Sequence, residues 1–171
     1  MRWWMGVVVS VLLAGPVQAG DGWMVGDLVG AAVIGSNGRV VGRIVDLYAD
    51  REGQVRTVEV EAQGEVVQVP WPSLHPDRAG HVVRLSGGVA HRAPPPSGLV
   101  SLVRSVGVPV TFRDGVTYGR VAAVKIGGDG RVELVMVKPA VPALQVYPLA
   151  WSALDYYSLP QTVPEVAETP R

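Results

Sequence analysis

The chain has 171 residues, with 15 Lys plus Arg against 15 Asp plus Glu, no cysteine, 21 Gly and 14 Pro, and 48% apolar residues. A neutral chain without a run of like charge argues against sequence-independent nucleic-acid binding, and the lack of cysteine excludes disulfides, thiol catalysis and cysteine zinc sites. The apolar fraction is too high for a disordered protein, and the many turn formers predict a small β-rich globular protein.

Residues 1–19 are predicted to form a secretory signal peptide. Arg2 precedes an apolar stretch at residues 3–13, Gly15-Pro16 ends it, and Val17-Gln18-Ala19 supplies small residues for cleavage. The stretch is shorter than the ~20 residues that a membrane-spanning helix needs. We therefore expect cleavage, a periplasmic or secreted protein, and no stable membrane insertion of the mature chain. A retained N-terminal anchor is the alternative.

An internal repeat with an offset of 77 residues divides the rest of the chain. Turn glycines and strand valines recur at both places, and the register is predicted to continue without a gap. The aligned residues include Gly30 with Gly107, Gly38 with Gly115, Gly42-Arg43 with Gly119-Arg120, Gly53 with Gly130, Val58 with Val135, Gln68 with Gln145 and Val69 with Val146. The prediction is a first unit at residues 28–86, a stiff Pro/Gly linker at 87–101, a second unit at 102–157 and a disordered tail at 158–171.

Short antiparallel strands are predicted within each unit. Asn37-Gly38 and Asp114-Gly115 provide the positive φ angles of tight hairpins. Valine-rich runs between the turns predict strands at about 31–35, 39–48, 54–62 and 65–70, with matching runs in the second unit. Alternation places four valines inward and four polar residues outward; these are Val58, Val60, Val67 and Val69, against Thr57, Glu59, Glu61 and Gln68. A small closed or nearly closed barrel follows, because closure removes exposed strand edges.

These motifs resemble the PRC-barrel family, whose small β-barrel occurs in the photosynthetic reaction centre H subunit and in the C-terminal part of a ribosome maturation factor. The resemblance rests on Asn37-Gly38 through Asp46-Leu47, on Asp50 to Gly53, on Val69-Pro70-Trp71-Pro72-Ser73-Leu74 and on the strand at His81 to Ser86. The second unit is a looser match, with Ala123 where the first has Asp46. The resemblance implies two tandem small β-barrels that serve assembly or interaction, and it carries over no catalytic residue.

No group of residues in the sequence forms a recognisable reaction centre. His75, His81 and His91 match no compact ligand spacing, and no Gly-x-Ser-x-Gly elbow is present. The run at 127–130 lacks the Lys-Ser/Thr and the helix of a phosphate loop, and the acidic turn at Asp50 offers too few oxygen ligands for calcium. We expect no enzyme, no cofactor and no metal, with loop histidines facing solvent.

Four aromatic residues follow the last strands of the two units. Trp71 and Trp151 are expected to plug the barrel ends, although aromatic side chains with a polar group also anchor interfaces. For Tyr156 and Tyr157 both roles remain open.

An apolar outer face is predicted for the second unit. Leu134 and Met136 stand where the first unit has Thr57 and Glu59, so this strand is apolar on both sides. A two-sided apolar strand has to be covered, either by the first unit or by a partner protein.

Two functional hypotheses follow. The first is a non-catalytic exported module that binds another envelope protein or itself, with Leu134, Met136, Tyr156 and Tyr157 as the interface. The second is a small-ligand or metal-binding module using the linker histidines.

Overall fold

The computed structural model describes residues 22–77, 79–87, 94–95, 97–111, 117–141, 145–154 and 159. The predicted signal peptide, His91, Asp114-Gly115, Tyr156, Tyr157 and all of the predicted tail except Leu159 lie outside these ranges. Within the described residues, no helix has the length and apolar character that crossing a membrane requires.

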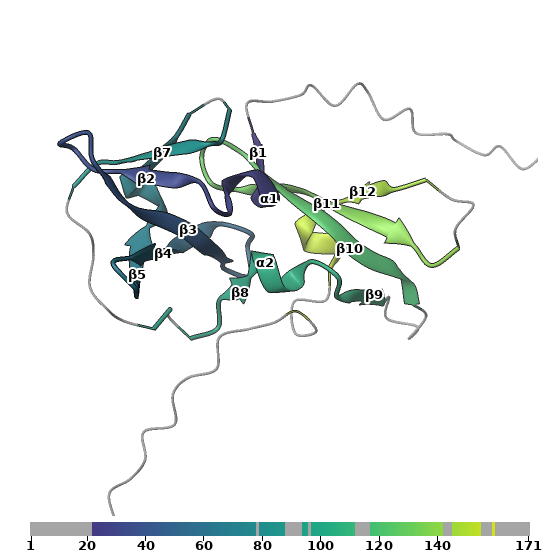
Figure 1. Ribbon diagram of the computed structural model, residues 1–171. Coiled ribbons are helices and arrows are strands. Elements are labelled where there is room, and N and C mark those ends of the chain that lie inside the picture. The colour runs from purple at the N-terminus through teal and green to yellow at the C-terminus, as the bar shows by residue number, and fades with distance from the viewer. Residues whose placement is uncertain are drawn as a thin grey trace, which may run out of the picture.

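The chain forms two β-sheets that lie side by side, with two one-turn helices at the centre (Figure 1). The first sheet has seven strands in the order β5-β4-β3-β2-β7-β6, with β8 also paired to β3. Its strands are β2 (Ala32–Ile34), β3 (Val40–Ala49), β4 (Val55–Ala62), β5 (Glu65–Pro70), β6 (Leu74–Pro76), β7 (Val82–Leu85) and β8 (Val100–Ser101). The strands predicted at 31–35, 39–48, 54–62 and 65–70 are confirmed to within a residue or so at each end.

The second sheet has five strands in the order β1-β10-β11-β12, with β9 also paired to β10. Its strands are β1 (Trp23–Met24), β9 (Pro109–Thr111), β10 (Thr117–Ile126), β11 (Val132–Pro139) and β12 (Tyr147–Leu149). The helices are α1 (Val25–Leu28), α2 (Leu102–Ser105) and two single 3₁₀ turns, η1 (Trp71–Ser73) and η2 (Trp151–Ala153). The prediction of a mostly β protein is confirmed.

Alternating valines form the interior of each sheet. Val58 and Val69 of the first sheet and Val135 and Val137 of the second are all completely buried. Each fully buried side chain of this size contributes about 1.5–3 kcal/mol. These residues belong to one continuous apolar cluster that spans both sheets, so the two halves of the chain share a core.

The two halves exchange their N-terminal segments. β1 and α1 precede the first sheet in sequence, yet β1 pairs with β10 of the second sheet, Trp23 lying opposite Ile126. β8 and α2 precede the second sheet, and β8 pairs with β3 of the first, Val100 lying opposite Ala49. The two strand pairings are equivalent under the 77-residue offset, because Trp23 corresponds to Val100 and Ala49 corresponds to Ile126. The two halves are therefore related by an approximate twofold rotation, and β8 is made from the last two residues of the predicted linker.

The repeat register contains an insertion that the sequence comparison missed. Val58 pairs with Val69 in the first sheet, whereas Val135 pairs with Leu149 in the second. Val69 therefore corresponds to Leu149, an offset of 80, and the predicted continuation of Val69 to Val146 without a gap is wrong. The cause is the connection between β11 and β12, which is longer than the two-residue turn Gln63-Gly64 between β4 and β5.

Two tryptophans fix the hairpins of one half against the other. Trp71 and Trp151 are both buried, at 4% and 7% exposure. The ring of Trp71 covers Gly130, a hairpin glycine of the second sheet with φ +80°, and the ring of Trp151 covers Gly53, its counterpart in the first, with φ +83°. The Nε1 of Trp151 also donates to the carbonyl of Arg51, at 3.0 Å. Both rings thus pack between the halves, against a hairpin of the other half, whereas the sequence predicted plugs at the barrel ends.

Candidate functional site

The outer face of the first sheet carries a polar cluster that is buried except for the half-buried Glu59 and the exposed Arg104. We call it the junction cluster: Asp46, Tyr48, Thr57, Glu59, Gln68, Ser101 and Arg104. β3 and β4 place Asp46 opposite Glu59 and Tyr48 opposite Thr57, while β5 places Gln68 opposite Glu59. Side chains that lie opposite each other in an antiparallel pair share one face of the sheet. Five polar side chains from three strands are thereby gathered on this face.

Asp46 is the centre of the junction cluster. It is only 7% exposed, and its carboxylate accepts hydrogen bonds from the Oγ of Ser101 at 2.6 Å, the backbone N of Leu47 at 2.7 Å and the backbone N of Val103 at 3.3 Å. Ser101 is also the N-cap of α2 and accepts from the backbone N of Arg104. Asp46 of the first sheet therefore holds the start of α2, a segment that leads into the second sheet.

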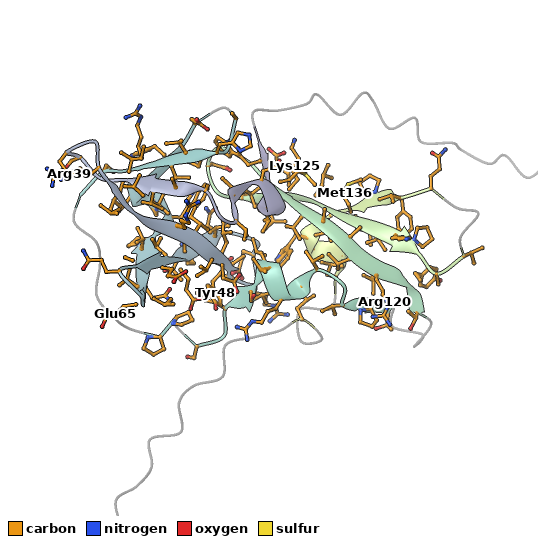
Figure 2. The ribbon with its side chains drawn as sticks, in the orientation of Figure 1. Arg39, Tyr48, Glu65, Arg120, Lys125 and Met136 are labelled. Atoms are coloured by element: carbon orange, nitrogen blue, oxygen red, sulfur yellow. The ribbon has the colours of Figure 1, made fainter. Side chains whose placement is uncertain are left out.

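Tyr48 lies beside this contact, near α2 (Figure 2). Its hydroxyl accepts a hydrogen bond from the guanidinium of Arg104 at 3.4 Å. Burial, and after it the negative charges of Asp46 and Glu59, raise the pKa of Tyr48 far above its ordinary value, while Arg104 opposes the shift. Tyr48 consequently stays a neutral hydrogen-bonding group at any physiological pH.

Thr57 and Gln68 do not face solvent as predicted. Both point away from the sheet interior, yet they are only 7% and 9% exposed. The hydroxyl of Thr57 donates to Oε1 of Gln68 at 3.0 Å, and Nε2 of Gln68 donates to Glu59 at 3.0 Å. These polar side chains satisfy one another within the sheet, and Tyr48 lies opposite Thr57 on the neighbouring strand. Alternation in the sequence gave the correct side of the sheet but not the burial.

The equivalent face of the second sheet is apolar, and we call it the apolar face: Ala123, Leu134, Met136 and Pro148. Met136 lies opposite both Ala123 and Pro148, and Leu134 lies opposite Lys125. Leu134 and Met136 are half-buried, Pro148 is exposed, and Figure 2 shows Lys125 and Met136 on this sheet. The predicted interface residues Leu134 and Met136 therefore do lie together, whereas Tyr156 and Tyr157 fall outside the described residues.

The apolar face lacks the polar contact that secures α2. Ala123 replaces Asp46, and Met24, the N-cap of α1, makes no side-chain capping hydrogen bond. The nearby Lys125 is instead paired with Glu133, Nζ to Oε2 at 2.8 Å. α1 is held by burial of Val25 and Leu28, at 2% and 0% exposure. The apolar face thus differs from the junction cluster in chemistry and in how its covering segment is attached.

The histidines and glycines considered as reaction centres have ordinary surroundings. His75 and His81 are both exposed, and Nε2 of His75 lies 3.0 Å from the hydroxyl of Ser86. No three His, Cys, Asp or Glu side chains within the described part of the chain are placed to hold a metal ion. Gly127 to Gly130 form the tight turn between β10 and β11, closed by a 2.9 Å bond from Gly130 N to Gly127 O.

Comparison with known families bears on the first sheet. The profile of the PRC-barrel domain matches residues 25–87, close to the predicted first unit of 28–86. The chain contains a PRC-barrel domain. The match spans α1 to β7, and Asp46 of the PRC-barrel domain is the residue that contacts Ser101 beyond its end. No curated protein matches the chain.

The junction cluster could have been suspected from the sequence, because Asp46 is a lone acid in an otherwise apolar stretch and Ala123 replaces it in the second half.

Proposed function

We propose that this protein is an exported, non-catalytic interaction module that binds another protein of the cell envelope through the apolar face. The single observation behind the proposal is the chemical difference between two equivalent faces. The face of the PRC-barrel domain is polar, buried and internally hydrogen-bonded, whereas the apolar face leaves Leu134 and Met136 half-buried beside an exposed Pro148. Apolar side chains that remain partly open next to polar surroundings are typical of protein-binding surfaces.

Export is supported by the sequence of residues 1–19, with its apolar core and small-residue cleavage site. The non-catalytic role is supported by the chemistry of the junction cluster. Asp46 is occupied by Ser101 and Val103 of the following segment, and Thr57, Gln68 and Glu59 bond one another within the first sheet. A catalytic group, by contrast, has to be within reach of a substrate.

The experiment is an affinity capture from the envelope fraction with the tagged chain, in parallel with the double variant Leu134→Glu/Met136→Lys. We expect a defined protein to be captured by the natural chain and lost with the variant, and the purified partner to bind with the same dependence. Val106→Glu is the matched control, because Val106 is 46% exposed and lies outside the apolar face. Equal capture by both chains, with both folded by circular dichroism, would refute the proposed surface.

A further inference from the structure

The far end of the second sheet presents exposed apolar and cationic side chains, which we call the second-sheet tip: Tyr118, Arg120, Lys138, Val141 and Val146. Tyr118, Val141 and Val146 are 43%, 56% and 47% exposed. The backbone bond from Ala140 N to Tyr118 O, at 2.9 Å, places Val141 next to Tyr118. No charged residue occurs in the sequence between Lys138 and Asp155. The tip thus combines an apolar surface with a cationic flank.

Arg120 and Lys138 lie directly opposite each other across β10 and β11. Like charges in this position repel, and the usual pair is of opposite sign. The equivalent residues of the first sheet, Arg43 and Glu61, form such an opposite pair in register. Two adjacent exposed cations are stabilised when an anionic group from outside approaches them.

The far end of the first sheet has the complementary features. A hollow of about 410 Å³ is lined by Val40, Val41, Gly42, Arg43, Glu61, Gln63 and Gly64. Val40 is 63% exposed at its edge, and Val66, 47% exposed, lies opposite Glu61. With the 77-residue offset, Val41 corresponds to Tyr118 and Glu61 to Lys138. The first-sheet hollow therefore offers space where the second-sheet tip carries a ring, and a carboxylate, with Arg43 opposite it, where the tip carries an ammonium group.

The two ends cannot meet within one molecule. Figure 2 shows Arg39 and Glu65 at one end of the protein and Arg120 at the other. A contact between the second-sheet tip and the first-sheet hollow therefore joins two copies. Such a contact is heterologous, because different surfaces of the two copies meet, and repeating it gives an open chain of molecules or a ring.

We propose that the protein associates with itself head to tail, the second-sheet tip of one copy entering the first-sheet hollow of the next. The ring of Tyr118 fills the hollow beside Val40 and Val41, and Lys138 faces Glu61. Arg120, whose guanidinium also donates to the carbonyl of Gly107 at 2.9 Å, lies beside Lys138. Exposed ion pairs contribute little individually, so the association is weak, reversible and reduced by salt. This contact uses none of the apolar face and is independent of the proposed function.

The test is sedimentation velocity of the intact chain over a wide range of concentration at low and high salt. We expect the average mass to rise with concentration and the rise to shrink in salt. Tyr118→Ser, Lys138→Glu and Glu61→Lys should each weaken association about tenfold or more, a change of about 1.4 kcal/mol. Arg84→Glu, an exposed charge reversal on β7, is the control that leaves association unchanged.

A mixture of two variants gives the sharpest outcome. Lys138→Glu and Glu61→Lys should each associate more weakly than the natural chain when alone but recover association when mixed, because the reversed charge of one variant then faces that of the other. Leu134→Glu/Met136→Lys should keep self-association even where it loses a partner protein. A chain that stays monomeric at every concentration overturns the proposal. So does association that the single variants leave intact, or a second-sheet tip that binds anionic vesicles while the chain remains monomeric.

Discussion

Replacing Asp46 by alanine should destabilise the whole protein. The carboxylate is buried and accepts two hydrogen bonds shorter than 2.8 Å, from Ser101 and Leu47, and a third from Val103. A hydrogen bond to a charged group contributes about 1.5–3 kcal/mol, so the two short bonds alone predict a loss of about 3 kcal/mol in the free energy of unfolding. Asp46→Asn keeps one acceptor oxygen and should lose about half as much.

The assay is urea unfolding followed by tryptophan fluorescence, since Trp71 and Trp151 are buried between the halves and report their separation. Ser101→Ala should lose about 2 kcal/mol, because it removes both the bond to Asp46 and the N-cap of α2. The double variant should lose less than the two single losses combined, by about 1 kcal/mol or more. Glu52→Ala in the exposed turn after Asp50 is the control and should remain within about 0.5 kcal/mol of the natural chain.

The reasoning would be refuted by either of two results. Asp46→Ala could unfold at the same urea concentration as the natural chain, which would mean that the buried carboxylate costs as much as its hydrogen bonds contribute. Alternatively, the losses from Asp46→Ala and Ser101→Ala could add without coupling. The contact between the sheets would then carry no energy of its own.

Three further predictions concern other contacts. Gly130→Ala should lower the free energy of unfolding by about 2 kcal/mol or more, because φ is +80° and the new methyl group would enter the ring of Trp71. Gly38→Ala, at φ +75° with open space around it, should lower it by only about 1 kcal/mol. The urea unfolding midpoints of the two variants test the difference. Trp151→Phe should cost about 1 kcal/mol through the lost bond to Arg51, and an unchanged midpoint would contradict that role. Because the pKa of Tyr48 is raised in the folded protein, its contribution to stability is complete below about pH 10, the pKa of tyrosine in the unfolded chain, and is lost as the pH rises above that value. Tyr48→Phe should therefore show a smaller decrease in the free energy of unfolding at alkaline pH than the natural chain.

The sequence predicted the local structure well. Valine alternation and glycine turns located the strands of the first sheet, because both signals depend on residues close together in the chain. It also placed Leu134 and Met136 on one face. What it could not predict were contacts made at long range. Thr57 was expected to be solvated, since alternation gives the side of the sheet on which a residue lies but not how deeply it is buried there. The insertion before β12 was hidden by a coincidental match of Gln145 to Gln68.

The exchange of N-terminal segments sets a condition on when this protein can fold. A chain emerges from the ribosome N-terminus first. Trp23 and Met24 have no strand to join until Lys125 and Ile126 have emerged, roughly a hundred residues later. Asp46 likewise waits for Ser101. The PRC-barrel domain is therefore incomplete for most of its synthesis. The two halves can therefore close on each other only when nearly all of the chain has emerged.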